Sequence, residues 1–434
     1  MSTMYSIAQL PLRKSIKPGV NPKLVATWSP EEVTAVDSLR EEFTSRIDRL
    51  NEAFTKDQHR AVIGKDDARD EVLTTLTASL ERYAEHLINF VAKHPTAAQH
   101  KFYFWGASIT ERLNHAFADY RYELLNCYAC VGLVYHEAAR FVLEIPSGSP
   151  LTEAMEKDGY ANLCFAAGYL QVAATLSAEM SVSPLPQLAS HDMLEESKTS
   201  FLECLRDTFL EEAQWVGLEK ALRNESNKNK EIVPKLTHRA LNLANSALEV
   251  VTKKMNSSAP VFKQFVLRLR VRFAVVESLV YAQTAPCRFD ASPGEALWFA
   301  KTAEMNVGEI HTVRAKVASQ SDASSKRLNE WAIVQSKRIS GAVDRIRQMN
   351  SLVCREKMGD GPFPLPQAQE LARSKPVALP RALPPVTTTT QSPPPSSGGQ
   401  PQSSPPPQQG SPTYNGSGHG TTQPPPPTYP TQSV

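Results

Sequence analysis

The residue pair best suited to chemistry is CYAC, in which Cys127 and Cys130 stand three positions apart. A CxxC pair can supply half of a zinc site or a redox-active dithiol. A zinc site needs four ligands, and neither a second CxxC nor an HxxxH pair stands near this one in the sequence. A thioredoxin-like site would need a βαβ context, which is absent. The sequence therefore predicts two buried thiols on a packed helix and no metal site.

Other candidate catalytic side chains are scattered. The chain contains no GxxxxGK[ST], GxGxxG, GxSxG or HExxH pattern. His94, His136 and His238 have no partners at ligand spacing, and we expect each to be structural. Cys204 and Cys354 lack a phosphate-cradling glycine loop. An enzyme with a site assembled from scattered residues stays open as an alternative, but the prediction is a protein without catalysis and without a cofactor.

One basic run could contact an anionic surface. Lys263, Arg268, Arg270 and Arg272 lie within VFKQFVLRLRVRF. Residues 268, 270 and 272 fall on different faces of a helix, so they form no continuous stripe. The run is either a solvated helix flank or a peripheral contact with acidic lipid headgroups. The net charge of +2 over 434 residues gives no global footprint for nucleic acid.

The C-terminal part of the chain has a different composition. From Ala382 onward no Asp, Glu, Lys or Arg occurs, and Pro, Ser, Thr, Gln and Gly dominate. Such a segment cannot bury enough apolar surface to offset the entropy lost on ordering. Residues 381–434 are therefore predicted to be a disordered, proline-rich tail.

This tail contains candidate ligands for proline-binding domains. Pro426, Pro427 and Tyr429 form a PPxY string, the ligand type of WW domains. Polyproline II preforms such a ligand, and an aromatic-lined groove accepts its Pro and Tyr side chains. The segment RALP at residues 381–384 is a partial SH3-type ligand. The alternative is a solubilising linker in which such strings arise by chance.

The elements before the tail are mainly helices. Residues 1–28 read as short extended pieces interrupted by prolines. Ser29 to Glu32 is a capping box with proline at the first helical position. Apolar residues then recur at three- and four-residue spacing, which predicts a succession of amphipathic helices. Later helices are predicted to start at Asp67 and Ser200, and to cover 119–140, 151–180, 231–256, 259–285, 292–320 and 322–351.

Composition indicates the size of the core and the cellular compartment of the protein. With 41% hydrophobic and 21% charged residues, the chain has ample material for a large core. We find no run of about 20 apolar residues and expect no membrane span. Six irregularly placed cysteines are typical of a reducing compartment. The expectation is a cytoplasmic protein.

Residues 200–236 carry a family resemblance. EAQ at residues 212–214, followed by VGLEKALRN, resembles the AQ-containing helix of the BRO-1 domain, the boomerang-shaped helical domain of Alix-type ESCRT adaptors. The next segment, KEIVPKL, resembles the part of that family that lines a docking groove. ELLN at residues 123–126 and GEAL at residues 294–297 resemble further family segments in the same order along the chain.

The resemblance implies a fold and a domain plan. It implies an all-α protein with tetratricopeptide-like helix packing and a small N-terminal β element. A single BRO-1 domain would cover residues 1–380, and the tail would cover 381–434. The proline-punctuated segment from Gly359 resembles an extended strap that runs back along the helices. The coiled second domain of Alix would be missing.

The resemblance also implies a function. It is that of a non-enzymatic adaptor whose groove binds the C-terminal amphipathic helix of the filament-forming ESCRT-III subunit. Such an adaptor would be recruited to endosomes, with possible peripheral membrane contact, and would act in multivesicular body sorting and membrane scission. A signalling scaffold of the ambient-pH-response type uses the same domain and stays open as an alternative.

Ile232 and Leu236 match the aliphatic residues of the groove. The third family contact is an aromatic residue on the preceding helix, near Gly217 or Leu218; if Gly217 is the match, that contact is lost. Periodicity alone favours another interpretation, because Ile232 and Leu236 begin an apolar stripe that continues along their helix. On that interpretation both residues belong to the core.

Overall fold

The computed structural model divides the chain into a compact unit, Met1–Thr388, and a second unit, Thr389–Val434. The residues it describes are 15–16, 28–55, 66–99, 104–105, 109, 115–116, 119–144, 151–182, 193–223, 227–255, 257–320 and 322–384. The tail sites Pro426, Pro427 and Tyr429 lie outside these residues. The domain boundary at residue 380 stays a prediction.

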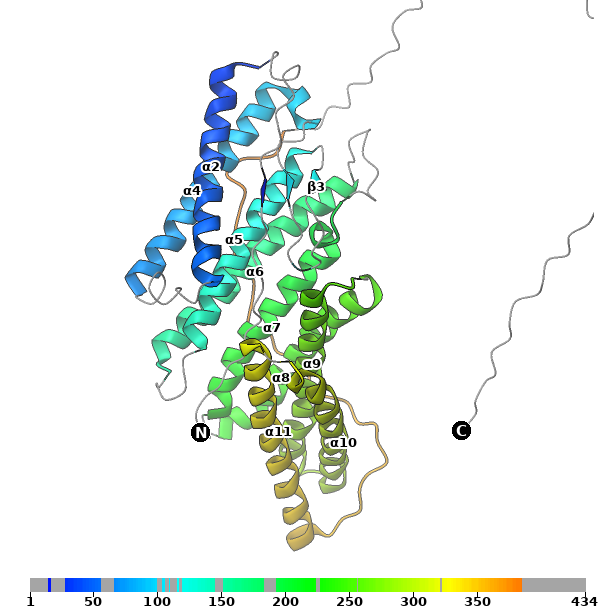
Figure 1. Cartoon of the computed structure of the whole chain (residues 1–434). Helices are drawn as coiled ribbons and strands as arrows, with labels where there is room; N and C mark the ends of the chain where they lie inside the picture. Colours follow the sequence, from blue (N-terminus) through cyan, green and yellow to red (C-terminus); the bar gives the residue numbers. More distant parts are fainter. Residues whose placement is uncertain are drawn as a thin grey trace, which may run out of the picture. The chain divides into compact units, whose positions relative to one another are not determined.

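Long helices dominate the first unit (Figure 1). They are α2 (Pro30–Thr55), α4 (Asp66–Lys93), α5 (Tyr120–Leu143), α6 (Glu153–Val182), α7 (Thr199–Arg223), α8 (Asn227–Lys253), α9 (Pro260–Arg288), α10 (Pro293–Ala318) and α11 (Ala323–Met349). Short turns of helix lie at Pro95–Gln99, Glu195–Ser197 and Asn350–Cys354. Each long helix packs against the next along the chain. The predicted all-α class is confirmed.

A small sheet accompanies the helices. Strand β1 (Ser15–Ile16) pairs antiparallel with β2 (Phe104–Trp105), and β2 pairs antiparallel with β3 (His115–Ala116). Only β1 comes from the extended N-terminal segment. The chain between α4 and α5 supplies the other two strands.

Helix α8 begins one turn earlier than the sequence predicts. The polar run NESNKNK favours a break up to Glu231, yet the helix starts at Asn227. Packing of α8 against α7 and α9 outweighs the weak helix propensity of its asparagines. Pro234 lies inside this helix and removes one backbone donor there.

Helix α5 is buried along nearly its whole length. Cys127 and Cys130 are both buried on α5, as the packing interpretation predicts. Burial, more than the nearby Glu123 carboxyl, raises the pKa of the Cys127 thiol well above its ordinary value. A thiol in this state is a poor nucleophile and a poor metal ligand.

Helix α6 is long and apolar enough to cross a membrane, judged by length and composition alone. This differs from the expectation that no such stretch exists. However, 67% of its most apolar window is buried inside the fold, where α6 packs between α5 and α7. Its apolar character is therefore explained by its central place in the core.

Candidate functional site

An extended segment crosses the helices after α11. Residues 355–384, called the strap below, contain no helix or strand. Its backbone is tied to one helix after another by Gly359 N to Gly294 O on α10 (2.9 Å), Gln369 N to Lys235 O on α8 (3.0 Å) and Lys375 N to Cys164 O on α6 (2.9 Å). The proline-punctuated segment from Gly359 resembles an extended strap that runs back along the helices. The structure shows residues 355–384 in that arrangement.

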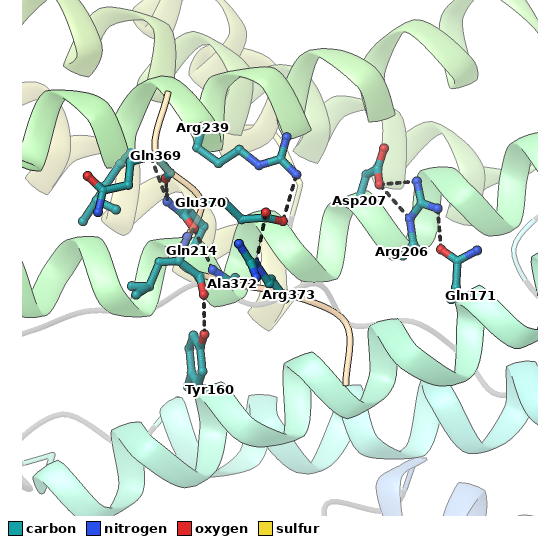
Figure 2. A network of polar contacts seen from close by, with 12 residues as sticks. Tyr160, Gln171, Arg206, Asp207, Gln214, Arg239, Gln369, Glu370, Ala372 and Arg373 are labelled. Atoms are coloured by element: carbon teal, nitrogen blue, oxygen red, sulfur yellow. Dashed lines mark hydrogen bonds and ion pairs between the residues drawn. The ribbon is translucent and has the colours of Figure 1, made fainter. Parts of the chain in front are cut away.

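Gln214 holds the strap to α7 and α8. Its side chain is fully buried, and its amide is satisfied on both sides (Figure 2). Nε2 donates to Leu236 O of α8 (3.2 Å) and to Gln369 O of the strap (3.0 Å). Oε1 accepts from the backbone amides of Leu371 (3.0 Å) and Ala372 (2.9 Å). The glutamine of the EAQ motif therefore joins two helices to the strap through four hydrogen bonds.

Three further contacts fix the strap on either side of Gln214, and Figure 2 shows those of Tyr160 and Arg239. The Tyr160 hydroxyl of α6 donates to Leu371 O at 2.9 Å. Arg239 of α8 contacts the Glu370 carboxylate at 3.4 Å. His238 Nδ1 lies 2.6 Å from Pro366 O and donates to it. His238 is thus structural, as predicted, and its partner is the strap.

The predicted groove residues occupy different depths. Leu218 and Leu236 are buried in the core, while Ile232 is partly buried and packs against the core from its edge. Of these three, Ile232 alone offers appreciable apolar surface to a partner. Leu218 and Leu236 are enclosed by the core and offer little surface to a partner.

Gly217 lies under the strap, and this feature was missed from the sequence. A Cβ atom at position 217 would come within 1.9 Å of Leu371 Cδ2. Leu371 is itself 44% exposed, so it covers the glycine on one side and faces solvent on the other. No local signal marks this contact, because the two residues are far apart in the sequence.

The basic run is corrected by the structure. Arg268 and Arg272 on α9 are buried, with relative exposures of 6% and 1%, so neither the solvated-flank nor the lipid-contact interpretation fits them. Lys263 and Arg270 are exposed on the same helix. Arg272 binds Glu211 of α7 at 2.6 Å and lies over the Trp331 ring.

A second buried polar contact lies beside the first. His136 Nε2 lies 2.7 Å from the Glu212 carboxylate, and the imidazole stacks on Phe209. Burial raises the pKa of Glu211, although Arg272 opposes it. For Glu212, His136 and the arginines outweigh the effect of burial and lower the pKa.

This arrangement argues for a structural role. Both partners of each pair are at most 2% exposed, so a substrate has no access to them. Among the residues that the structure describes, no three His, Cys, Asp or Glu side chains gather as a metal site would require.

Comparison with known proteins identifies solved structures that share the fold of this chain. No family model matches the chain, and no curated protein matches its sequence. A solved structure of the "ALIX BRO1 CHMP4C complex" has a TM-score of 0.57 and 17% identity, and the match covers 86% of this chain and 96% of that one. A second, "Structure basis for endosomal targeting by the Bro1 domain", has a TM-score of 0.54 and 14% identity, covering 86% and 94%.

Proposed function

This chain has the fold of a BRO1 domain, and from that premise we propose that it is a non-enzymatic, ESCRT-associated adaptor. The observation that carries the proposal is the match along 96% of a BRO1 chain whose complex includes CHMP4C. The partner is the C-terminal amphipathic helix of the corresponding ESCRT-III subunit. A helix of this kind lays its apolar face in a shallow groove.

The docking surface lies on α7 and α8. Ile232 is the direct apolar contact, because it is the predicted groove residue that is only partly buried. Leu236 and Leu218 are buried, so they would support this surface from within the core. An aspartate in place of Ile232 would put a charge into an apolar contact, which is costly without a partner.

The cellular role follows from such a partner. The chain would be recruited to endosomes and act in multivesicular body sorting and membrane scission. Residues 1–380 would form the BRO1 domain. The tail would recruit WW proteins through Pro426, Pro427 and Tyr429, and SH3-type proteins more weakly.

The test is a titration of the full chain against a fluorescent peptide of the CHMP4C C-terminal helix. We expect micromolar binding to the wild type and at least a tenfold loss with Ile232→Asp. Val353→Asp is the matched control, because Val353 is 77% exposed and lies outside α7 and α8. Circular dichroism checks the fold of both variants.

Absence of binding to the wild type would contradict the proposed partner. Equal losses in Ile232→Asp and Val353→Asp would contradict the surface. If Ile232→Asp unfolds the chain, Ile232→Ser replaces it as the test of the surface, since serine carries no charge.

A further inference from the structure

We infer that the turn after α11 inserts its apolar side chains into the surface of an anionic lipid bilayer. These side chains, called the apolar tip below, are Met349, Leu352, Val353 and Met358. The tip lies outside α7 and α8, so the inference goes beyond the proposed docking surface and is tested separately from it.

Exposed apolar side chains are concentrated at this turn. Among the residues that the structure describes, seven large apolar side chains are exposed, and four of them make up the apolar tip. Leu352 and Val353 are 80% and 77% exposed, so nearly their whole side chains face solvent. A single exposed leucine is ordinary, but a group of large apolar side chains in one short segment is typical of an interaction site.

The backbone of the turn has a defined conformation. The Arg355 amide donates to Asn350 O at 2.7 Å, and Arg355 adopts the left-handed conformation with a φ of 51°. The Asn350 side chain closes the turn, because its Nδ2 donates to Glu356 O (3.0 Å) and its Oδ1 accepts from the Glu356 amide (3.2 Å). Leu352 and Val353 lie between these residues and are therefore presented by a closed turn.

The tip protrudes from the helices. Helix α11 ends at one extremity of the helical unit, and the chain turns there before it runs back as the strap (Figure 1). A partner helix would need a groove that receives its apolar face. A protruding turn suits a bilayer instead, because the boundary between headgroups and acyl chains accepts apolar side chains to a depth of about 5–10 Å.

Basic residues surround the tip. Residues 345–358 contain four basic residues and one acidic residue, a net charge of +3 in a chain whose total is +2. Arg347 is paired with Glu304 of α10. The other three are exposed and form no ion pair with a residue that the structure describes: Arg345, Arg355 and Lys357.

This charge argues for lipid as the occupant. Anionic lipid headgroups attract basic side chains close to the bilayer surface. Long basic side chains stay among the headgroups while neighbouring apolar side chains enter the hydrocarbon. The apolar tip and its three unpaired basic neighbours fit both parts of such a surface.

The test measures binding of the full chain to vesicles of about 30% phosphatidylserine in phosphatidylcholine. We expect the wild type to bind these vesicles at least tenfold more tightly than vesicles of phosphatidylcholine alone. Val353→Asp should weaken binding to the anionic vesicles by about tenfold or more. Val182→Asp is the matched control, because Val182 is 83% exposed at the end of α6, and it should bind as wild type does. Circular dichroism checks the fold of both variants.

A second measurement separates insertion from attraction by charge. Val353→Trp places a fluorophore at the tip, and vesicles with brominated acyl chains should quench it if the tip enters the hydrocarbon. The five native tryptophans give a background that is measured in the wild type. Val182→Trp is the control and should show no quenching beyond that background.

The outcomes distinguish lipid from other occupants. Equal vesicle binding by Val353→Asp and wild type, or binding without quenching of Val353→Trp, would overturn the inference. A wild type that binds neither kind of vesicle would also overturn it. A wild type that is dimeric without vesicles, beside a monomeric Val353→Asp, would assign the tip to a second copy of the chain and overturn the lipid contact.

The inference and the proposed function fail separately. Ile232→Asp should bind the anionic vesicles as wild type does, and Val353→Asp should bind the CHMP4C peptide as wild type does. Loss of vesicle binding in Ile232→Asp would overturn the assignment of lipid contact to the tip. Absence of peptide binding by the wild type would contradict the proposed function and leave the lipid contact standing.

Discussion

Gln214 shows how one side chain can fasten an extended segment to a pair of helices. Replacing it by alanine would remove the Gln214 partner of the Leu371 and Ala372 amides and of the Gln369 carbonyl. Unsatisfied buried polar groups cost about 1–3 kcal/mol each, and the strap would relax to recover part of this. We expect Gln214→Ala to lower the free energy of unfolding by about 2–4 kcal/mol.

Urea unfolding measures this loss, and hydrogen exchange of the Leu371 and Ala372 amides locates it. Gln171→Ala is the matched control, because Gln171 is an exposed glutamine on α6 that contacts Arg206. We expect that control to change stability by less than about 0.5 kcal/mol. Slow exchange of both strap amides in Gln214→Ala would contradict the role given to Gln214.

Arg272 is the second residue whose removal should be severe. Arg272→Met would leave the Glu211 carboxylate buried beside the core without its partner at 2.6 Å. Breaking a buried pair in this way costs about 3–5 kcal/mol. Arg270→Met removes the same charge from the exposed side of α9 and should cost little. Equal stability of the two variants in urea unfolding would show that Arg272 is not held as described.

At the scale of elements, α10 and α11 are joined by an exposed ion pair that should respond to acid. Hydrogen bonds from Arg347 of α11 and then Lys301 lower the pKa of Glu304 to about 2. Since the folded pKa lies below the unfolded one, this contribution is complete above about pH 4.5 and is lost as the pH falls toward 2.

Unfolding free energies measured from pH 5 to 2 should therefore fall less steeply in Glu304→Gln than in the wild type. The Glu304 side chain is 39% exposed, so salt should weaken the difference. Glu330→Gln, at an exposed position of α11, is the control. Parallel pH profiles for Glu304→Gln and wild type would contradict the assignment.

The sequence predicts where the helices lie better than it predicts which residues from distant parts of the chain contact them. Apolar periodicity located most helices, because burying one stripe of each drives their packing. It placed the start of α8 too late, since tertiary packing outweighs local propensity. It also treated Arg268 and Arg272 as surface residues, because the buried partner of Arg272, Glu211, is 61 positions away on another helix.

The candidate site was predictable only in part. The EAQ motif pointed to α7, but periodicity does not say that Gln214 faces a strap some 155 residues later. Ile232, Leu236 and Leu218 share one apolar pattern, and only packing separates the partly buried Ile232 from the two buried leucines. The close approach of Leu371 to Gly217 gave no signal, since the two residues are far apart in the sequence.

At the scale of the whole molecule, the tail should act separately from the helical unit. WW domains bind Pro and Tyr of a PPxY ligand through an aromatic-lined groove. We expect Tyr429→Ala to abolish capture of the full chain by an immobilised WW domain while leaving CHMP4C-peptide binding unchanged. Tyr414→Ala, in the other tyrosine-containing part of the tail, is the control. Equal capture of Tyr429→Ala and wild type would contradict the PPxY prediction.

The central claim is that a partner helix docks on α7 and α8. The most direct measurement is photo-crosslinking of the full chain to a CHMP4C helix peptide that carries a photoreactive group on its apolar face, with adducts mapped by mass spectrometry. We predict adducts within residues 217–239, and their loss in Ile232→Asp. Adducts confined to the tail or to the turn after α11, or no adducts above those of a scrambled peptide, would contradict the claim.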